Sequence, residues 1–368
     1  MARRRITPAI VGLVLVAVLA SGVARATSPG VAPEARLARS LVGEGAPGSL
    51  VVVRTPAGVR RAAAGLGRRQ PPVAMRALDL FRVASITKTF VAAVVLQLVG
   101  EGRLSLGDPV EKWLPGLVPN GEKITVRELL SHTSGLYEYM DDSAFVKVAI
   151  AHPARRWSPR RLVAIAVSHR PLFPPGTGWS YANTNYVVLG LVIEAATGKP
   201  VAEELRDRIF RPLGLGETSF PAGTGIAGHY AHGYVGFATL PTIPAGTFVD
   251  ASTAVSPSIA WAAGAIVSNA DDVTKFYATL LGGGLLRPGL LMAMKTPVLR
   301  TNDGLGLFRV QTACGPAFGH DGISVGYRNV VYSRPDGSRV ADVMVNIDST
   351  YVAQKDVEKA AKAALCFG

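Results

Sequence analysis

The sequence predicts a mixed fold of the α/β (α+β) class, in which one antiparallel sheet built from both ends of the chain is flanked by helices. Strand patterns occur before residue 65 and again after residue 315, while the segment between them has mostly helical patterns and long turns. The chain has 368 residues, of which 48% are hydrophobic, so it can bury a substantial core. We expect five strands, two near the start and about three near the end.

The first two strands form a predicted hairpin. Residues 50–54 and 59–64 have strand patterns and flank Thr55-Pro56-Ala57-Gly58, a plausible turn. An extended piece from Leu80 to Val83 then leads to Ser85. From Ser85 to Gly100 the chain is almost wholly apolar, and a helix that is apolar on all sides is buried. We therefore expect a central helix that begins near Ser85.

The rest of the chain continues as helices and then strands. Helices are expected at Thr125-Val126-Arg127-Glu128, which has the form of a capping box, and at residues 187–196, 270–281 and 352–365. Strands are expected at residues 317–319, leading into His320, and at residues 327–333 and 339–347, which flank a hairpin turn. The pattern predicts a sheet lobe from about residues 27–100 and 300–368, and a helical lobe from about residues 101–299.

The N-terminus has the form of a secretory signal peptide. Arg3, Arg4 and Arg5 precede an apolar run at residues 9–20, and Ala24-Arg25-Ala26 offers a small-residue cleavage site. The run is too short for a permanent membrane span; an N-terminal anchor is the alternative, and the arginines also permit twin-arginine export. We expect residues 1–26 to be removed and residues 27–368 to be secreted or extracytoplasmic.

Charge and cysteine content exclude several classes of protein. Of the formal charge of +13, +9 stays after cleavage, because residues 1–26 carry four arginines and no acidic residue. The densest basic stretch, residues 155–161, lies in no nucleic-acid-binding motif, so we interpret it as a solvated face. No later segment is apolar enough to span a membrane. Cys314 and Cys366 cannot make a four-cysteine zinc site; outside the cytosol we expect them to form a disulfide, the alternative being two buried free thiols.

The first candidate for chemistry is Ser85-Ile86-Thr87-Lys88. At i and i+3 on a helix, Ser85 and Lys88 share one face. A serine hydroxyl needs a base to become nucleophilic, and burial can lower the pKa of a lysine amine enough for that task. A capping serine beside a solvated lysine is the alternative, but a lone lysine in an otherwise apolar helix needs a reason.

Two further motifs follow in order. Tyr181-Ala182-Asn183 follows a rigid turn and precedes an apolar helix; a phenol can exchange protons if cations depress its pKa, and an amide can orient a substrate carbonyl. The alternative is a capping loop with a buried tyrosine. His320-Asp321-Gly322 begins a strand, where Gly322 would let a substrate backbone approach closely. The alternative is a strand-entry turn with a surface histidine.

Together the three motifs resemble those of the serine β-lactamase and penicillin-binding protein superfamily. The order is S-x-x-K, Y-x-N and a basic-x-Gly triplet on a late strand. Other family-like stretches are residues 129–136, which include His132, and residues 212–215 and 262–264. The resemblance covers roughly residues 35–365. A histidine in the third motif is similar to exported D-alanyl-D-alanine carboxypeptidases rather than to class C β-lactamases, which carry lysine there.

The resemblance implies a role for each motif residue. Ser85 would form an acyl-enzyme, Lys88 and Tyr181 would share its proton, and Asn183 would position the substrate amide. His320 would add polarity beside Tyr181. The backbone N–H groups of Ser85 and Ile323 would form the oxyanion hole. His132 is interpreted as structural, and no metal or cofactor is implied.

Two departures from the family pattern affect the expected substrate. Asp321 stands where the family often has threonine, and an ionised Asp321 would repel a substrate carboxylate unless a cation such as Arg309 intervenes. Ile323 is apolar where a hydroxyl would help. A peptide that ends in a free D-alanine is therefore a less favourable substrate than a neutral ester or an amine-bearing compound.

The sequence thus predicts an exported serine hydrolase similar to D-alanyl-D-alanine carboxypeptidases. The alternatives are an esterase or a class C-type β-lactamase on the same scaffold, or a catalytically silent binder of penicillin or wall peptide. The expected partner is a small-molecule or peptide substrate, with cell-wall peptide and β-lactam as candidates, and not nucleic acid. The oligomeric state stays open.

Overall fold

The computed structural model describes residues 31–236, 244, 247–347 and 352–367. Ala32 to Gly368 group into one compact unit. The expected signal peptide, residues 1–26, lies outside the described residues, and the division into two lobes stays a prediction. Among the described helices, none combines the length and the apolar character needed to cross a membrane.

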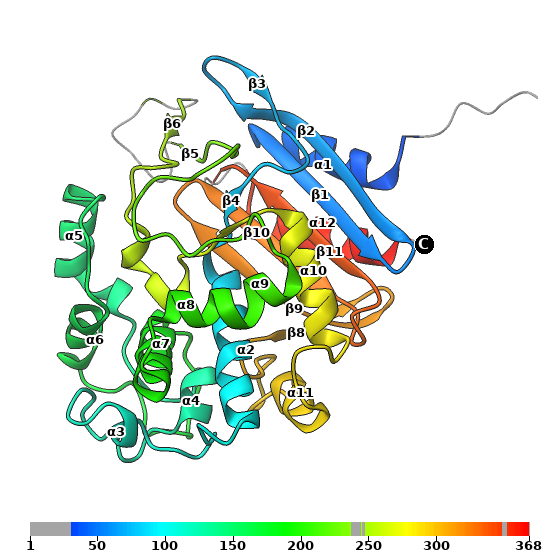
Figure 1. Ribbon diagram of the computed structural model, residues 1–368. Coiled ribbons are helices and arrows are strands. Elements are labelled where there is room, and N and C mark those ends of the chain that lie inside the picture. The colour runs from blue at the N-terminus through cyan, green and yellow to red at the C-terminus, as the bar shows by residue number, and fades with distance from the viewer. Residues whose placement is uncertain (1–30, 237–243, 245–246, 348–351, 368) are drawn as a thin grey trace, which may run out of the picture. The chain divides into compact units, whose positions relative to one another are not determined.

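The main sheet is antiparallel and joins the two ends of the chain (Figure 1). Within the described residues it has seven strands in the order β3-β2-β1-β11-β10-β9-β8. Its strands are β1 (Gly48–Thr55), β2 (Gly58–Arg68), β3 (Val73–Ala74), β8 (Phe308–Thr312), β9 (Gly315–Ser324), β10 (Tyr327–Ser333) and β11 (Val340–Val345). Strand β1, from the start of the chain, pairs with β11, from its end, which confirms the predicted assembly.

The sequence predicts five strands, and the two additional ones are the edge strands β3 and β8. Strand β3 has only two residues, and β8 alternates between half-buried and exposed positions until its last residue. Neither has the apolar run that marks a strand in a sequence. Two-stranded ladders also pair β4 (Phe81–Arg82) with β7 (Val267–Ser268) and β5 (Tyr234–Val235) with β6 (Val249–Asp250).

The helices lie on both faces of the sheet and in the segment between its two halves (Figure 1). They are α1 (Pro33–Gly43), α2 (Thr87–Gly100), α3 (Val110–Trp113), α4 (Val126–Leu130), α5 (Ser143–Ala151), α6 (Pro159–Val167), α7 (Asn183–Thr197), α8 (Val201–Leu205), α9 (Arg211–Leu213), α10 (Ala270–Leu281), α11 (Pro288–Lys295) and α12 (Gln354–Cys366). Short 3-10 turns are η1 (Ala84–Ile86), η2 (Tyr139–Asp141), η4 (Pro257–Ile259) and η5 (Trp261–Ala263), and η3 (Arg206–Phe210) is a π-helical turn. The predicted capping box at Thr125 and Glu128 is confirmed.

Two hydrophobic cores cover the two faces of the sheet. Alternating side chains of β1 divide between them: Leu50 and Val52 belong to one core, and Val51 and Val53 to the other. Helix α10 packs on the first face and helices α1 and α12 on the second. Helix α2 is fully buried within the first core over most of its length, as the sequence predicts. Its start is therefore fixed against the sheet.

Glycine 322 lets β9 approach the start of α2. A Cβ atom at this position would lie 2.1 Å from the carbonyl oxygen of Val83 and 3.3 Å from the Cβ of Ala84. The sequence pattern predicts that a substrate backbone lies beside Gly322, but the backbone before Ser85 occupies that space. Gly322 therefore joins the third motif to the first.

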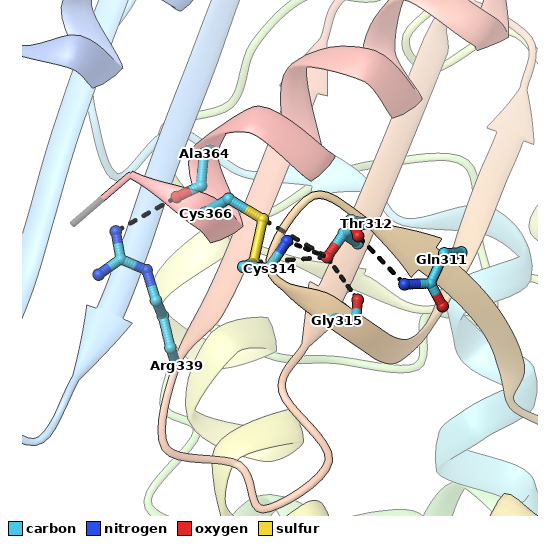
Figure 2. Close-up of a disulfide and its surroundings, with 7 residues drawn as sticks. All are labelled: Gln311, Thr312, Cys314, Gly315, Arg339, Ala364 and Cys366. Carbon is cyan, nitrogen blue, oxygen red and sulfur yellow. Dashed lines mark hydrogen bonds between the residues drawn. A yellow bond between two sulfur atoms is a disulfide. The ribbon is translucent and has the colours of Figure 1, made fainter.

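A disulfide ties the C-terminal helix to the edge of the sheet (Figure 2). Cys314, in the β8–β9 turn, is bonded to Cys366 at the end of α12, with Cα atoms 5.5 Å apart. The side chain of Thr312 closes the turn by donating to the carbonyl of Gly315 at 2.6 Å. The sequence leaves a disulfide and two free thiols as alternatives, and the structure has the disulfide.

Asp342 is a carboxyl group buried in the middle of the sheet. It lies on β11 opposite Val52 of β1 and Val331 of β10, and none of its surface is exposed. Burial raises the pKa of Asp342 well above its usual value, and the N–H of Val343 offsets only part of this effect. The group is therefore neutral in the folded protein and ionised in the unfolded chain at neutral pH.

We predict that Asp342→Asn stabilises the protein increasingly as pH rises. Above about pH 4 the unfolded wild-type chain gains stability by ionising Asp342, up to about 1.4 kcal/mol per pH unit, until the folded-state pKa is reached. Asparagine has no such pH dependence. Urea unfolding at pH 5 and pH 8 measures the effect, with exposed Glu122→Gln as the control. An equal gain at both pH values contradicts the prediction.

We also predict that Gly322→Ala lowers the rate of acylation of Ser85 at least tenfold, because the added methyl group must push β9 away from the Val83 backbone. The control is Gly289→Ala on α11, where a Cβ atom has no neighbour within 4 Å among the described residues. Rates measured with a serine-directed label show the difference. Equal rates in the two variants would mean that this contact does not position the site.

Candidate active site

Ser85 lies at the junction of η1 and α2, on a backbone that one neighbour holds in an unusual conformation. Ala84 has a φ of 50°, a left-handed value that costs a residue with a side chain free energy. The residues around it are held on two sides, since the N–H of Val83 donates to the carbonyl of Ile266 at 3.1 Å and β9 packs against the same loop. The hydroxyl of Ser85 is half-buried.

Lys88 is completely buried and makes three contacts through its amine. Its Nζ lies 2.8 Å from Oγ of Ser85, 2.8 Å from Oδ1 of Asn183 and 2.8 Å from the carbonyl oxygen of Ala263. These partners come from the first motif, the second motif and the family-like stretch at residues 262–264. The lone lysine of the apolar helix is therefore the point where three segments meet.

The contacts of Lys88 suit both forms of its amine: an ammonium group donates to all three oxygens, and a neutral amine donates to two and accepts from Ser85. Burial lowers the pKa of Lys88 to about 7, against the charges of Glu138 and Asp321, which act to raise it. A carbonyl oxygen and an amide oxygen can only accept hydrogen bonds, so Asn183 and Ala263 take the two N–H bonds of a neutral amine. Its lone pair then faces Ser85, which has a proton to give. This arrangement allows Lys88 to act as the base for Ser85.

Tyr181 lies beside Ser85 and Lys88. The amine of Lys88 lies 4.9 Å from the ring centroid of Tyr181, and the side chain of Ser85 is close enough to affect the pKa of the phenol. Burial raises the pKa of Tyr181 well above 10, and Asp321, Glu138 and Asp303 add to the rise. The condition under which a phenol gives up its proton at neutral pH, a pKa depressed by cations, is not met, because desolvation and carboxylates dominate here. The phenol keeps its proton and is suited to donate it.

His132 holds the Tyr181 loop in place, which agrees with its predicted structural role. Its ring stacks on the ring of Tyr181 at a centroid distance of 4.4 Å. Its Nδ1 accepts from the N–H of Ala182 at 3.2 Å and from Nδ2 of Asn185 at 3.1 Å. Burial lowers the pKa of His132 well below its usual value, so the ring is neutral and can accept both bonds.

Glu138 is a site residue that the sequence analysis misses. Its carboxylate accepts the N–H of Asn183, the first residue of α7, and the N–H of Met140 at 2.9 Å. A carboxylate at a helix N-terminus satisfies free N–H groups and interacts favourably with the helix dipole. Burial raises the pKa of Glu138, and these hydrogen bonds and Lys88 oppose the rise. Glu138 thereby positions Asn183 and supplies negative charge near Lys88.

His320 reaches the site from β9. Its ring is 1% exposed and lies 6.4 Å from the ring of Tyr181 between centroids. Its Nδ1 lies 2.6 Å from the backbone carbonyl of Asp321. A carbonyl can only accept, so Nδ1 carries a hydrogen and donates it to this carbonyl. The contact fixes the orientation of the ring beside Tyr181.

The other residues predicted near the third motif, Asp321, Arg309 and Ile323, lie in different surroundings. The carboxylate of Asp321 lies 3.5 Å from Nδ1 of His320 and accepts from Nε2 of Gln354, on α12, at 3.1 Å. Asp321 therefore has Gln354 and His320 as neighbours, while Arg309 is exposed. Ile323, by contrast, is half exposed and lines the same pocket as Ser85. The role of its N–H in an oxyanion hole stays a prediction.

A pocket with a volume of about 400 Å³ opens beside Ser85. Most of its wall is apolar, and it is lined by Arg82, Ala84, Ser85, Met140, Asn183, Ala251, Val255, Ser256, Pro257, Ile259, Ala260, Ala263, Gly264, Ile323, Ser324 and Val325. Arg82 is the cation in this wall, and its guanidinium donates to the carbonyls of Ser252 at 3.0 Å and Thr224 at 2.5 Å. Within the described residues, no group of three or more histidine, cysteine or acidic side chains could hold a metal ion.

Comparisons with known proteins agree with this geometry. The solved D-stereospecific amidohydrolase from a Streptomyces species has a TM-score of 0.81 and is 37% identical, covering 89% of this chain and 97% of that chain. Penicillin-binding protein 4 of Amycolatopsis lactamdurans is 28% identical over 321 residues, which are 82% of this chain and 81% of that protein. Esterase EstB of Burkholderia gladioli is 37% identical over 174 residues, 44% of this chain and 43% of the esterase.

The family model described as Beta-lactamase matches residues 34–365, almost the range that the three motifs predict. Ser85, Lys88, Tyr181, Asn183 and His320 all lie within this range. The structure places Ser85, Asn183 and the ring of Tyr181 beside the amine of Lys88, and His320 beside Tyr181. The chain therefore belongs to the Beta-lactamase family and is a serine hydrolase.

Proposed function

We propose that this chain hydrolyses amides and esters through an acyl-enzyme on Ser85, and that the acyl group is apolar. The observation that supports this most directly is the amine of Lys88, which is fully buried and 2.8 Å from each of one hydroxyl and two accept-only oxygens. Lysine is an unusual residue at a fully buried position, because a buried charge is unfavourable. Its use as a base explains its presence.

The proposed reaction has two stages. Neutral Lys88 takes the proton of Ser85 while Oγ attacks the substrate carbonyl, and the N–H groups of Ser85 and Ile323 bind the oxyanion. Tyr181 then donates its proton to the leaving group and regains one from Lys88 through the hydroxyl network. Asn183 orients the substrate amide and also fixes the amine of Lys88. In the second stage water takes the place of the leaving group and releases the acid.

The pocket beside Ser85 supports an apolar acyl group. Its volume of about 400 Å³ accommodates one side chain of aromatic size, and aliphatic side chains such as Met140, Val255 and Ile259 form its wall. Apolar surface buried there contributes roughly 25 cal/mol per Å². The amidohydrolase relative makes amides with a D-configured acyl part the first substrates to test.

A D-alanyl-D-alanine carboxypeptidase is the second candidate. The order of the three motifs and the relation to Penicillin-binding protein 4 favour it. Export is part of both candidates: the basic and apolar N-terminal segment has the form of a signal peptide, and a disulfide such as Cys314–Cys366 is typical of oxidising compartments.

We predict that Ser85→Ala abolishes covalent labelling by a fluorophosphonate and by a fluorescent penicillin. The wild-type protein should cleave p-nitrophenyl acetate and D-phenylalanine amide, because both lack a carboxylate and fit the apolar pocket. Nitrocefin and a D-Ala-D-Ala peptide, compared in the same assay, test the second candidate. Labelling that survives in Ser85→Ala would place the nucleophile elsewhere.

We predict that acylation becomes faster as pH rises, with a midpoint near 7, since the base is the neutral form of Lys88. Glu138→Gln removes a negative charge that raises the pKa of Lys88, so it moves the midpoint to lower pH by about one unit. Single-turnover acylation with a substrate that does not ionise between pH 5 and 9 measures both midpoints.

The matched control is Asp141→Asn, which removes an exposed charge three residues from Glu138 and leaves the midpoint in place, because water screens that charge. A midpoint that moves to higher pH in Glu138→Gln, or does not move, contradicts the assignment of Lys88 as the base.

A further inference from the structure

Asp303 is a buried carboxyl group next to the catalytic centre that the steps above do not use. It lies between α11 and β8 and is 5% exposed. Its N–H donates to Oγ1 of Thr301 at 3.1 Å, its carbonyl accepts the N–H of Val298 at 2.8 Å, and it forms a β-bridge with Phe308. Backbone contacts on both sides therefore fix its position.

The same segment packs against the catalytic residues. Phe308, the bridge partner of Asp303, stacks on the ring of His320 at 4.2 Å and lies 6.5 Å from the ring of Tyr181. Burial raises the pKa of Asp303, and the side chain of Trp179, two residues before Tyr181, is near enough to oppose the rise. Asp303 is also close enough to Tyr181 to add to the rise in the pKa of the phenol, after burial and the nearer carboxylates.

This side of the centre is where the leaving group must lie. The acyl pocket is lined by Ser85, Asn183 and Ile323, but Tyr181, Trp179 and His320 are not in its wall. In the proposed reaction Tyr181 gives its proton to the leaving group, so that group has to contact the phenol. The segment that carries Asp303 and Phe308 flanks Tyr181 there.

Burial raises the pKa of Asp303 to about 7, so the charges on this side are negative above about pH 7. Asp303 and Asp321 are close enough to affect each other, and each disfavours ionisation of the phenol. Among the described residues Asp303 forms no ion pair with a lysine, arginine or histidine within 4.0 Å. The nearest catalytic cation would be Lys88, which is neutral when it acts as a base. A carboxylate brought here meets like charge in a desolvated environment.

We propose that Asp303 is a specificity-determining residue, which with Asp321 disfavours leaving groups that carry a carboxylate and favours neutral or ammonium-bearing ones. The inference rests on the proposed function and names the leaving-group class of that same site. Asp303 acts through the electric field at Tyr181 rather than through contact with the substrate, because its side chain is nearly inaccessible. It also places this chain among hydrolases of substituted amides and esters rather than carboxypeptidases.

The test compares two substrates that share an acyl group, N-acetyl-D-phenylalanyl-D-alanine and its C-terminal amide. Release of D-alanine and of D-alaninamide gives kcat/KM for each, and the ratio of the two isolates the charge of the leaving group. Wild type favours the amide. Both substrates are assayed at about pH 8.5, where Asp303 is ionised. Asp303→Asn keeps the size and polarity of the side chain and raises the ratio of acid to amide about tenfold, the effect of one nearby charge. The ratio of the two kcat/KM values is the measured quantity, because a change in the acidity of Tyr181 affects both substrates alike and cancels in the ratio.

Asp336→Asn, in the exposed β10–β11 turn, is the matched control and leaves the ratio unchanged. If Asp303→Asn does not fold, Asp303→Ser removes the same charge with a smaller polar side chain. A ratio that stays at the wild-type value in a folded variant that cleaves both substrates overturns the inference and leaves the proposed function standing. A wild-type enzyme that cleaves neither substrate and takes up no fluorophosphonate overturns both.

Discussion

The site depends on one buried amine. Removing an ammonium group from water is strongly unfavourable, and a buried lysine is stable only where its pKa falls or where acceptors surround it. Both conditions hold for Lys88, whose pKa falls to about 7 and whose Nζ has three oxygen neighbours at 2.8 Å. The acceptors belong to η1, α7 and η5, three segments separated in the sequence. Packing of α2 in the core fixes the amine of Lys88, so η1, α7 and η5 must each bring an oxygen to that point.

The sheet brings the third motif to this point from the other end of the chain. Strand β11 pairs with β1, which places the C-terminal strands beside the N-terminal hairpin. Strand β9 can then reach the Ser85 loop only because residue 322 has no side chain. At its far edge β9 continues into a turn that the disulfide ties to α12 (Figure 2). The position of His320 is therefore held from both sides of the sheet.

The sequence was sufficient to locate the groups that the chemistry needs, because their residue types and order are restricted. Ser85, Lys88 and Asn183 meet as predicted, and the apolar helix and the two hairpins are where their patterns indicate. Edge strands β3 and β8 leave too little apolar pattern to be found. Glu138 and Asp303 are not found for another reason: an acidic residue in a loop is normally solvated, and only the fold half-buries Glu138 and buries Asp303. Burial likewise raises the pKa of Tyr181, which no sequence pattern indicates.

These buried carboxylates explain how one centre combines a usable base with a restricted substrate range. Burial alone would lower the pKa of Lys88 further, and a weaker base takes a proton from serine less readily. Glu138 and Asp321 oppose that fall and keep the amine near neutrality. The same negative charges, together with Asp303, raise the pKa of Tyr181 and so keep its proton available for a leaving group. A field that serves both proton transfers also opposes any anion brought to the site, so the basicity of Lys88 and the exclusion of carboxylates have a common physical origin.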